Sequence, residues 1–546
     1  MSERKLDLLI RNATILTMYA DRPAARSVGV SAGRIVAVGE ELDGATADRE
    51  VDAAGLTVLP GFNDVHCHTT WFGLSLTEVD LSVQSSMDDV YAALQRRAGE
   101  SADGAWVVAS GFNHQKFGGR YPDIDMLDAI APRNPIYIRH NSGHACIVNS
   151  TALGLAGFLA ADYREEAGAV AVRDERGRFT GLLEERAQQA VQRLFLPYSQ
   201  GSIVGAIDRA TQVYATEGIT SFTEAGIAGG WIGHSPLELG AYQTALETGV
   251  LRARAQLMVS LDALHEMSGH RDDNMTLGLD LGVRTGFGND FLKIGPTKVF
   301  LDGSLLGLTA AMSEAYCAGV SDNHGYFQGD VEEMRQRILA AYRAGWSIAA
   351  HAIGDEAIDF ALEVFEFARE AYGPRSVPNR IEHGGVITDA QLARLAAVGA
   401  VVVPQPGFVP AFGAEMARAL GEERVHQSYR AASLIAAGIP LPGSSDRPVT
   451  SGTVLPNIQA FVERRYGGDQ VYGPGERISV EAALRAYTLG SAEATGEAGL
   501  RGSIRPGKLG DFVFLDRNPL LSPVEEISDI AVMATVVGGT FIHDRL

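Results

Sequence analysis

Short apolar runs that end in glycine or polar residues alternate with stretches of helical periodicity through the middle of the chain. This alternation of strand and helix is typical of α/β proteins with a parallel sheet. Strand-helix units in series predict a (β/α)8 barrel of the TIM type, with a doubly wound sheet as the alternative. Eight runs have the pattern of buried strands: 57–64, 219–223, 252–259, 293–301, 347–350, 379–382, 400–404 and 439–443.

The two ends of the chain have a different pattern. Residues 1–59 and 490–546 alternate short apolar segments with turn residues, as β-hairpins do. Because both ends share this pattern, we predict that they pair in one small, discontinuous β-sandwich domain around a barrel domain of residues 60–489. About 150 residues separate the first two barrel strands, so we expect an inserted α/β subdomain at 75–205.

Composition narrows the classes of partner. The 546 residues include 46 Lys and Arg against 67 Asp and Glu, a formal net charge of −21. That balance argues against nucleic acid and anionic membranes as partners, because both are bound by clustered positive charge. The chain has three cysteines and no long apolar run, so we expect a cytoplasmic protein without a disulfide framework, a membrane span or a signal peptide.

Histidine and aspartate residues fall where the expected strands end. His66 and His68 close the first run, and residues two apart on a strand project from one face, so they can converge on one metal ion. His351, His383 and Asp446 follow the fifth, sixth and eighth runs. The strand ends of a barrel meet at one mouth, so these residues together predict a divalent-metal site there.

Other polar residues near these strand ends have more than one explanation. Lys298 lies in the fourth run, and when this lysine is considered alone, a buried ion pair explains it, for instance with Asp302, four residues on. Asp64 and Asp355 are candidates to orient imidazoles, with a strand-end turn or helix cap as the alternative. Cys67, between the two histidines, is expected to pack as a small apolar group.

The whole constellation resembles the metal-dependent amidohydrolase superfamily, over nearly the full chain. Four motifs narrow the resemblance to the subgroup that contains N-substituted formamide deformylase, within amidohydrolase family 3. They are Ser142-Gly-His144-Ala-Cys-Ile-Val-Asn149-Ser150, Lys298-Val-Phe-Leu-Asp302-Gly-Ser304, His351-Ala-Ile-Gly-Asp355 and Gly443-Ser-Ser-Asp446-Arg-Pro-Val449.

The resemblance implies one or two divalent ions, with Zn²⁺ expected, bound by the histidines at 66, 68, 351 and 383. It implies that Lys298 is N-carboxylated and bridges two ions, and that Asp446 serves as a ligand and as the general base. A bound metal lowers the pKa of water to about 7, and Asp446 would pass the water proton to the leaving nitrogen. The resemblance also implies a homodimer.

Candidate substrate contacts lie near these residues in the sequence. In the resemblance His144 faces the metal site, so we expect it to bind the substrate carbonyl or an oxyanion. Trp71, Phe112 and Phe408 are candidate pocket walls, with ordinary core packing as the alternative. Arg447 either binds an anionic group of the substrate or points into solvent.

The expected activity is hydrolysis of a non-peptide carbon–nitrogen bond of a small molecule, in an amide, a formamide or a cyclic amide. Deamination of a heterocycle and a non-catalytic barrel are the alternatives. The segment Gly29-x-Ser31-x-Gly33 matches a serine-hydrolase nucleophile elbow, but a strand-like run follows it where the elbow needs a helix. Thr223-Glu224 stands where the subgroup often has His-Asp, which predicts a changed polar contact.

Overall fold

The computed structural model describes residues 5–546 except 142, 144, 166–168, 231 and 274. The chain forms two compact units, and each is described by itself. The larger unit holds residues 1–69 and 207–546, and the smaller one holds residues 70–206. The domain boundaries expected from the sequence remain predictions.

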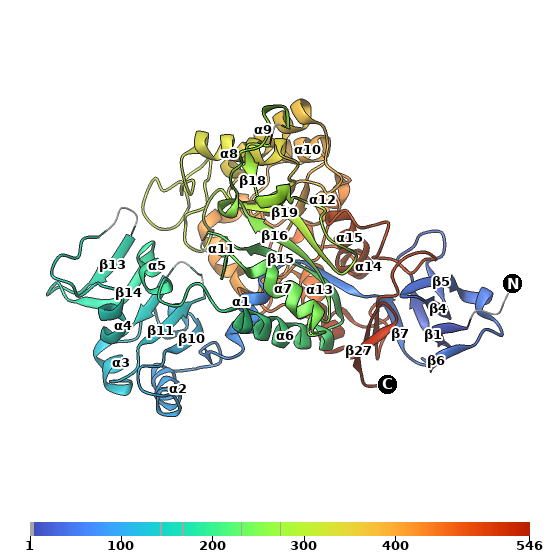
Figure 1. Cartoon of the computed structure of the whole chain (residues 1–546), viewed down its shortest axis with the longest axis horizontal. Coiled ribbons are helices and arrows are strands. Elements are labelled where there is room, and N and C mark those ends of the chain that lie inside the picture. The colour runs from blue at the N-terminus through green and yellow to red at the C-terminus, as the bar shows by residue number, and fades with distance from the viewer. Residues whose placement is uncertain (1–4, 142, 144, 166–168, 231, 274) are drawn as a thin grey trace. The chain divides into compact units, whose positions relative to one another are not determined.

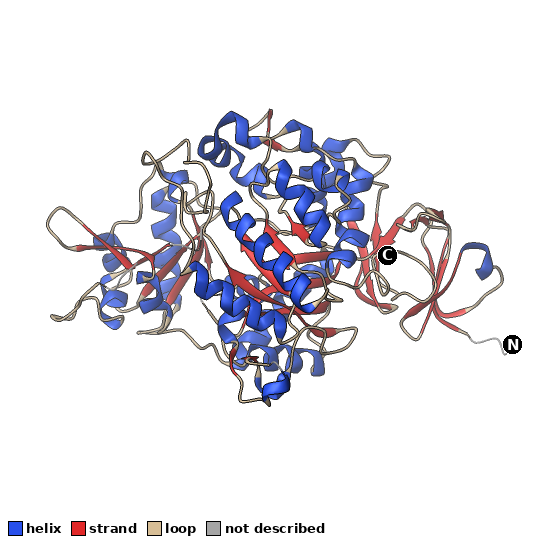
Figure 2. Cartoon of the chain, turned by 90° about the horizontal axis from the view of Figure 1, so that it is seen from above, coloured by secondary structure: helices blue, strands red, loops and turns tan. Residues whose placement is uncertain are grey.

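A seven-stranded parallel sheet is the centre of the larger unit, and helices pack around it (Figures 1 and 2). Its strands are buried on both faces, which explains why they read as continuous apolar runs. The nearly closed sheet gives the larger unit a TIM-like α/β fold. In sheet order the strands are β22 (Val401–Val403), β21 (Arg380–His383), β20 (Ile348–Ala352), β19 (Leu292–Phe300), β16 (Arg254–Ser260), β15 (Ile219–Ile227) and β8 (Phe62–Cys67).

The eighth expected strand, residues 439–443, is not a strand in the structure. Pro440 and Pro442 lack the N–H groups that a ladder of hydrogen bonds would need. The segment still closes the barrel, because Val65 N–H donates to Gly443 O at 3.1 Å. We call residues 439–447 the closing segment.

The first expected run is two strands instead of one. Residues Thr57–Pro60 form β7, which pairs with the C-terminal strand β25 (Phe512–Leu515), whereas β8 pairs with β15 in the barrel. The chain changes sheet at Gly61, where a Cβ atom would lie 2.2 Å from the Thr220 side chain. Only glycine fits this crossing without moving β15.

The remaining strands of the two chain ends form two sheets that share one apolar core, including Ile10, Val30, Val58 and Phe514. The first sheet contains N-terminal strands alone, and the second combines both ends of the chain. The first is β5 (Arg34–Val38), β4 (Val28–Ser31), β1 (Leu6–Arg11) and β6 (Ala47–Asp52); the second is β27 (Thr540–Asp544), β26 (Val532–Val537), β25, β7, β2 (Thr14–Leu16) and β3 (Ala24–Ala25).

The smaller unit is a six-stranded mixed sheet with short helices. Its sheet order is β13 (Ala169–Arg173), β14 (Phe179–Glu185), β12 (Ala145–Val148), β11 (Ile136–His140), β10 (Val107–Phe112) and β9 (Val79–Asp80). Its helices are α1 (Thr69–Ser75), which begins at the unit boundary, α2 (Met87–Glu100), α3 (Ile124–Ile130), α4 (Ser150–Leu155) and α5 (Ala187–Gln192).

Most of the longer helices of the larger unit follow barrel strands. Throughout the described chain, none is long and apolar enough to cross a membrane. They are α6 (Gln200–Thr216), which begins in the smaller unit, α7 (Glu238–Glu247), α8 (Val331–Arg343), α9 (Asp355–Tyr372), α10 (Asp389–Val398), α11 (Phe408–Val425), α12 (Ala432–Ala436), α13 (Val454–Glu463), α14 (Val480–Arg485) and α15 (Ser491–Ala494).

A buried ion pair joins the barrel to the terminal sheets. Arg254, at the start of β16, donates to Asp511 from Nε at 2.8 Å and from Nη2 at 3.0 Å. Both side chains are less than a tenth exposed. We expect Asp511→Asn to lower the free energy of unfolding by about 3–5 kcal/mol, because it leaves a buried guanidinium without its carboxylate.

Calorimetric melting of the two variants Asp511→Asn and Asp48→Asn measures this. Asp48 pairs with Lys5 on the surface, so its replacement should cost less than about 1 kcal/mol. Equal melting temperatures for the two variants would contradict the importance of the buried pair.

Candidate metal centre

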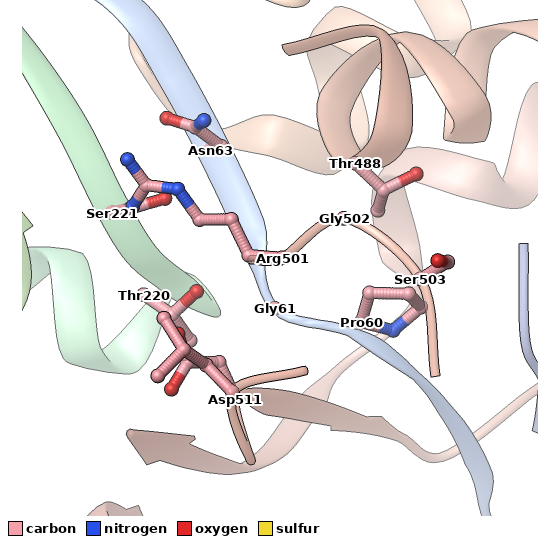
Figure 3. Close-up of a pocket in the computed structure, with 11 residues that line it drawn as sticks. Pro60, Gly61, Asn63, Thr220, Ser221, Thr488, Arg501, Gly502, Ser503 and Asp511 are labelled. Carbon is pink, nitrogen blue, oxygen red and sulfur yellow. The ribbon is translucent and has the colours of Figure 1, made fainter. Parts of the chain in front are cut away.

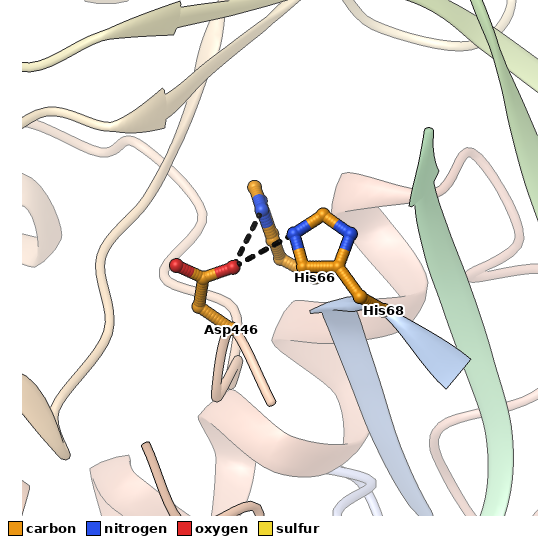
Figure 4. Close-up of side chains that lie close together, drawn as sticks. All are labelled: His66, His68 and Asp446. Atoms are coloured by element: carbon orange, nitrogen blue, oxygen red, sulfur yellow. Dashed lines mark ion pairs between the residues drawn. The ribbon is translucent and has the colours of Figure 1, made fainter. Parts of the chain in front are cut away.

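Three ligand-type side chains meet at the carboxyl end of β8. His66 and His68 come from the end of that strand, and Asp446 comes from the closing segment. Asp446 Oδ1 lies 3.3 Å from His66 Nε2 and 3.0 Å from His68 Nε2 (Figure 4). All three side chains are buried, and one ligand atom of each lies within 4.8 Å of the others. Two imidazoles and a carboxylate at this spacing suit a divalent transition metal.

A buried ion pair orients His66. Its Nδ1 lies 2.5 Å from Glu382 Oε2, and Arg380 donates to the same carboxylate from Nε at 2.7 Å and from Nη2 at 2.9 Å. Burial alone would raise the pKa of Glu382, but Arg380 and His66 hold that pKa well below its ordinary range. Because an ionised carboxylate only accepts, His66 Nδ1 carries the proton, and the lone pair of Nε2 is directed toward Asp446.

Gln405 fixes the tautomer of His383. The Gln405 side-chain amide donates to Val403 O at 2.8 Å and to Ser444 Oγ at 3.1 Å. Its oxygen is left to accept from His383 Nδ1, at 2.7 Å. The lone pair of His383 is therefore on Nε2.

His351 has the opposite tautomer. Its Nε2 donates to the carbonyl oxygen of Gly303 at 2.9 Å, which places the lone pair on Nδ1. That nitrogen is buried and has no hydrogen-bond partner among the residues that the structure describes. The ring centroid of His351 is 4.6 Å from that of His383, which is 4.9 Å from that of His66. The three rings therefore form one cluster.

Lys298 faces this cluster without an ion pair to Asp302. Its Nζ is buried, lacks a hydrogen-bond partner in the described part of the chain and lies 4.9 Å from the centre of the Phe300 ring. Burial lowers the pKa of Lys298 to about 8, although Glu382 and Asp446 act to raise it. The ion pair with Asp302, which would explain a lysine on this strand without a metal site, is not formed.

Asp302 instead holds the turn that follows His351. Its carboxylate accepts from Ile353 N at 3.0 Å and from Gly354 N at 2.8 Å. Burial raises the pKa of Asp302 to about 7 even though these N–H groups lower it. Asp302 thereby fixes the backbone next to a candidate ligand.

Asp64 and Asp355 hold loops instead of imidazole rings. Ser445 donates to Asp64 Oδ2 from Oγ at 2.5 Å, and both Ser445 N and His66 N donate to Asp64 Oδ1 at 3.2 Å. Asp64 thus ties the closing segment to β8. Asp355 accepts from the backbone and hydroxyl of Ser313, so it matches the turn alternative that the sequence left open.

Two residues of the cluster have left-handed backbone conformations. The φ angle is 74° at His383 and 57° at Asp446. Each conformation costs a residue with a side chain about 1–3 kcal/mol, and such strain persists where surrounding contacts impose it, typically at functional sites. The contacts here are Gln405 with His383, and the closing segment with β8.

The donor set fits a metal ion. Burial lowers the pKa of His68, lowers that of His383 to about 3 and takes that of His351 well below its ordinary value, so these rings are neutral and able to ligate. Burial would raise the pKa of Asp446, but His66 and His68 hold it well below its ordinary range. Two buried atoms, His351 Nδ1 and Lys298 Nζ, have no hydrogen bond to any described residue. Buried polar atoms ordinarily have a partner, and a bound cation with its ligands would supply one for both.

The candidate substrate contacts lie in different parts of the molecule. Trp71 in α1 and Phe112 at the end of β10 belong to the smaller unit, and His144 lies outside the described residues. Phe408, at the start of α11, stacks against His383 with ring centroids 6.1 Å apart. The structure therefore brings Phe408 to the histidine cluster.

Arg447 is buried, so the alternative in which it points into solvent is wrong. Its Nη1 lies 2.8 Å from Glu217 Oε2, and its guanidinium lies 5.3 Å from the centre of the Tyr214 ring. These contacts tie the closing segment to α6 and the turn after it. A contact of Arg447 with an anionic group of the substrate stays a prediction.

Sequence reasoning missed Glu382 and Gln405. A signal was available for the first, because Arg380 and Glu382 are two charged residues on one face of an expected buried strand, where they must pair. Gln405 is a polar residue directly after the seventh run, at the same kind of strand end as His351 and His383. Both residues act on the site through an imidazole, a role that spacing along the sequence does not mark.

Comparison with known proteins identifies the family. The model of the amidohydrolase family matches residues 49–543. The chain belongs to the amidohydrolase family. It is 31% identical to Protein LONG AFTER FAR-RED 3 of Arabidopsis thaliana, over 98% of this chain and 91% of that protein. It is 29% identical to the N-substituted formamide deformylase of Arthrobacter pascens, over 99% and 98% of the two chains.

A solved structure has the same architecture. The crystal structure of an uncharacterized metal-dependent hydrolase from Pyrococcus horikoshii superposes with a TM-score of 0.76 at 26% identity, covering 95% of this chain and 99% of that one. Family membership, this likeness and the His66, His68 and Asp446 cluster make this amidohydrolase a hydrolytic enzyme with a divalent-metal site.

Replacement of Glu382 by glutamine should weaken metal binding by about 10- to 100-fold, because His66 loses the carboxylate that fixes its tautomer. Chelator competition followed by elemental analysis measures the change, and circular dichroism checks the fold. Glu366→Gln is the matched control, since Glu366 pairs with Arg394 on the surface. An unchanged affinity in folded Glu382→Gln protein would show that the pair does not tune the ligand.

Proposed function

We propose that this amidohydrolase hydrolyses a non-peptide carbon–nitrogen bond of a small molecule, in an amide, a formamide or a cyclic amide. The observation that carries the proposal is the convergence of one carboxylate, four histidines and one lysine, Lys298, at the carboxyl ends of the barrel strands. The similarity to an N-substituted formamide deformylase extends over nearly the full length of both chains, and it supports a carbon–nitrogen bond as the bond that is cleaved.

The proposed ligands are His66, His68, Lys298, His351, His383 and Asp446. We propose one or two ions, with Zn²⁺ as the expected metal, and N-carboxylation of Lys298. The buried amine has a lowered pKa and no hydrogen-bond partner among the described residues, so it is suited to react with carbon dioxide and become an anionic oxygen ligand. As a cationic amine it would repel a metal ion.

Asp446 is the proposed general base. A bound divalent ion would lower the pKa of a water molecule to about 7 and polarise the scissile carbonyl. The ionised Asp446 carboxylate accepts the proton of the attacking water and returns it to the leaving nitrogen. Positive backbone φ at Asp446 and the Asp64–Ser445 hydrogen bonds hold this carboxylate beside His66 and His68.

Of the candidate substrate contacts, Phe408 lies at the histidine cluster. Phe408 would form an apolar wall beside His383. His144 as a donor to the carbonyl, and Trp71 and Phe112 as further walls, stay predictions. Four further features also stay predictions. They are a homodimer, a cytoplasmic location, the absence of nucleic-acid and membrane partners, and a β-sandwich domain built from both chain ends.

A serine-hydrolase mechanism has no support in the fold. Ser31 pairs with Arg34 in the hairpin between β4 and β5, and Gly33 has a φ of 74° in its turn. A nucleophile elbow needs a strand followed by a helix. Ser31→Ala should therefore keep full activity.

Metal and Asp446 should both be required for turnover. Purified protein should contain a divalent ion. Chelation should abolish hydrolysis, and zinc, manganese or cobalt should restore it. The substrates to test are a panel of amides, formamides, cyclic amides and amino-substituted heterocycles.

Asp446→Asn should lower kcat/KM by about 10²- to 10⁴-fold. Asp359→Asn, at an exposed ion pair on α9, is the control and should be unchanged. Turnover by metal-free protein would refute the proposal, and turnover of heterocyclic amines alone would replace it with deamination.

Lys298→Ala should reduce the bound metal by about one ion per chain in a two-metal enzyme, with partial rescue by acetate. Lys293→Ala provides a matched control on the same strand, because Lys293 pairs with Glu497 far from the histidines. Elemental analysis of both variants measures the difference. Full metal content and activity in Lys298→Ala would show that this lysine is structural.

A further inference from the structure

A second polar site lies at the opposite end of β8 from the metal centre. A small cavity is enclosed where the first residues of β8 and β15 meet the loop that leads to β25 (Figure 3). It has room for about one ligand of the size of a water molecule. Its polar lining includes Asn63, Ser221, Thr488, Arg501 and Asp511.

Three of these side chains have unused hydrogen-bonding atoms. Arg501 Nε and Nη1, both side-chain atoms of the Asn63 amide, and Ser221 Oγ have no hydrogen-bond partner within the described part of the chain. The exposed fractions of the residues are 6% for Arg501, 2% for Asn63 and 1% for Ser221. Figure 3 shows the Arg501 guanidinium between Asn63 and Ser221. Donors dominate this set, because only the amide oxygen of Asn63 and the serine hydroxyl can accept.

The charges around the cavity leave one positive charge uncompensated among the described residues. Arg254 pairs with Asp511, while Arg501 and Lys293 share the single carboxylate of Glu497. Three cations thus face two anions.

A further carboxylate near Arg501 does not change this balance. Asp290 pairs with Arg34 at 2.6 Å. Burial lowers the pKa of Arg501 to about 10 in spite of attraction by Asp511 and Asp290. The guanidinium therefore stays charged at neutral pH although it is buried.

We propose that this cavity binds one small monovalent anion of the halide class, held by Arg501, Asn63 and Ser221. A water molecule would fill the space but would leave the buried charge, whereas an anion accepts from the guanidinium, amide and hydroxyl donors and neutralises it. The size of the cavity excludes phosphate and larger oxyanions. Because the site joins β8 and β15 to the loop before β25, occupancy should stabilise the junction of barrel and terminal sheets.

Bromide is the probe that tests the site. Crystals of the full-length, metal-loaded protein grown in sodium bromide should show an anomalous bromine peak within hydrogen-bonding distance of Arg501 and Asn63. In solution, replacing gluconate by bromide at constant ionic strength should raise the melting temperature by about 1–3 °C and reach a plateau. Water alone in the cavity, with no bromine peak, would overturn the proposal.

Variants separate specific binding from a general salt effect. Asn63→Asp supplies a carboxylate beside Arg501, so it should abolish the bromide-dependent rise and the bromine peak while the protein stays folded. Ser221→Ala should shift the plateau to a higher bromide concentration. Thr488→Val is the control, because the Thr488 hydroxyl already donates to Leu484 O at 2.7 Å and adds no donor to the cavity. An equal bromide response in all three variants would also refute the site.

Discussion

The metal centre depends on the backbone hydrogen bonds that close the barrel between β8 and the closing segment. Asp446 N–H donates to His66 O, and His68 N–H donates to Arg447 O, both at 2.7 Å. These bonds alternate along the two segments, so they fix Asp446 opposite the two histidines as β-ladder bonds would. The closing segment lacks the donors for a longer ladder, and side chains replace the missing bonds. Asp64 holds its inner end through Ser445, and Glu217 holds its outer end through Arg447.

This closure places chemical groups where water cannot stabilise them. The imidazoles of His351 and His383 are driven to their neutral forms by burial, and Arg380 and His66 keep Glu382 charged in spite of its burial. Left-handed backbone at His383 and Asp446 adds local strain. The rest of the barrel must supply the free energy for these features, which its apolar strands and helices do. A site of this kind is costly to fold without a cation, which argues that metal binding and stability are coupled.

The sequence predicted most of this because the barrel repeats one simple pattern. Seven apolar runs became parallel strands, and the ligand candidates at 66, 68, 351, 383 and 446 converge as strand ends in a barrel must. The prediction of the eighth run as a strand was wrong because its two prolines, despite the apolar character of the run, cannot donate the hydrogen bonds of a strand. The first run was wrong as one strand because nothing in its apolar pattern marks Gly61 as a crossing between sheets. Contacts made across the fold, such as Gln405 with His383 or Arg447 with Glu217, depend on loop paths that local patterns do not encode.

The tautomers of the histidines show where sequence information ends and tertiary structure begins. His66 and His383 present Nε2 because a side chain accepts from Nδ1, whereas His351 presents Nδ1 because the Gly303 carbonyl accepts from Nε2. A motif identifies each as a histidine at a strand end and cannot distinguish these cases. Presenting Nδ1 brings the lone pair closer to the backbone, so His351 reaches a shared ion only if its strand end is held in place. Asp302 holds it by binding the turn after β20. The aspartate in the fourth strand's motif is thus explained by the histidine of the fifth, and not by the lysine four residues before it.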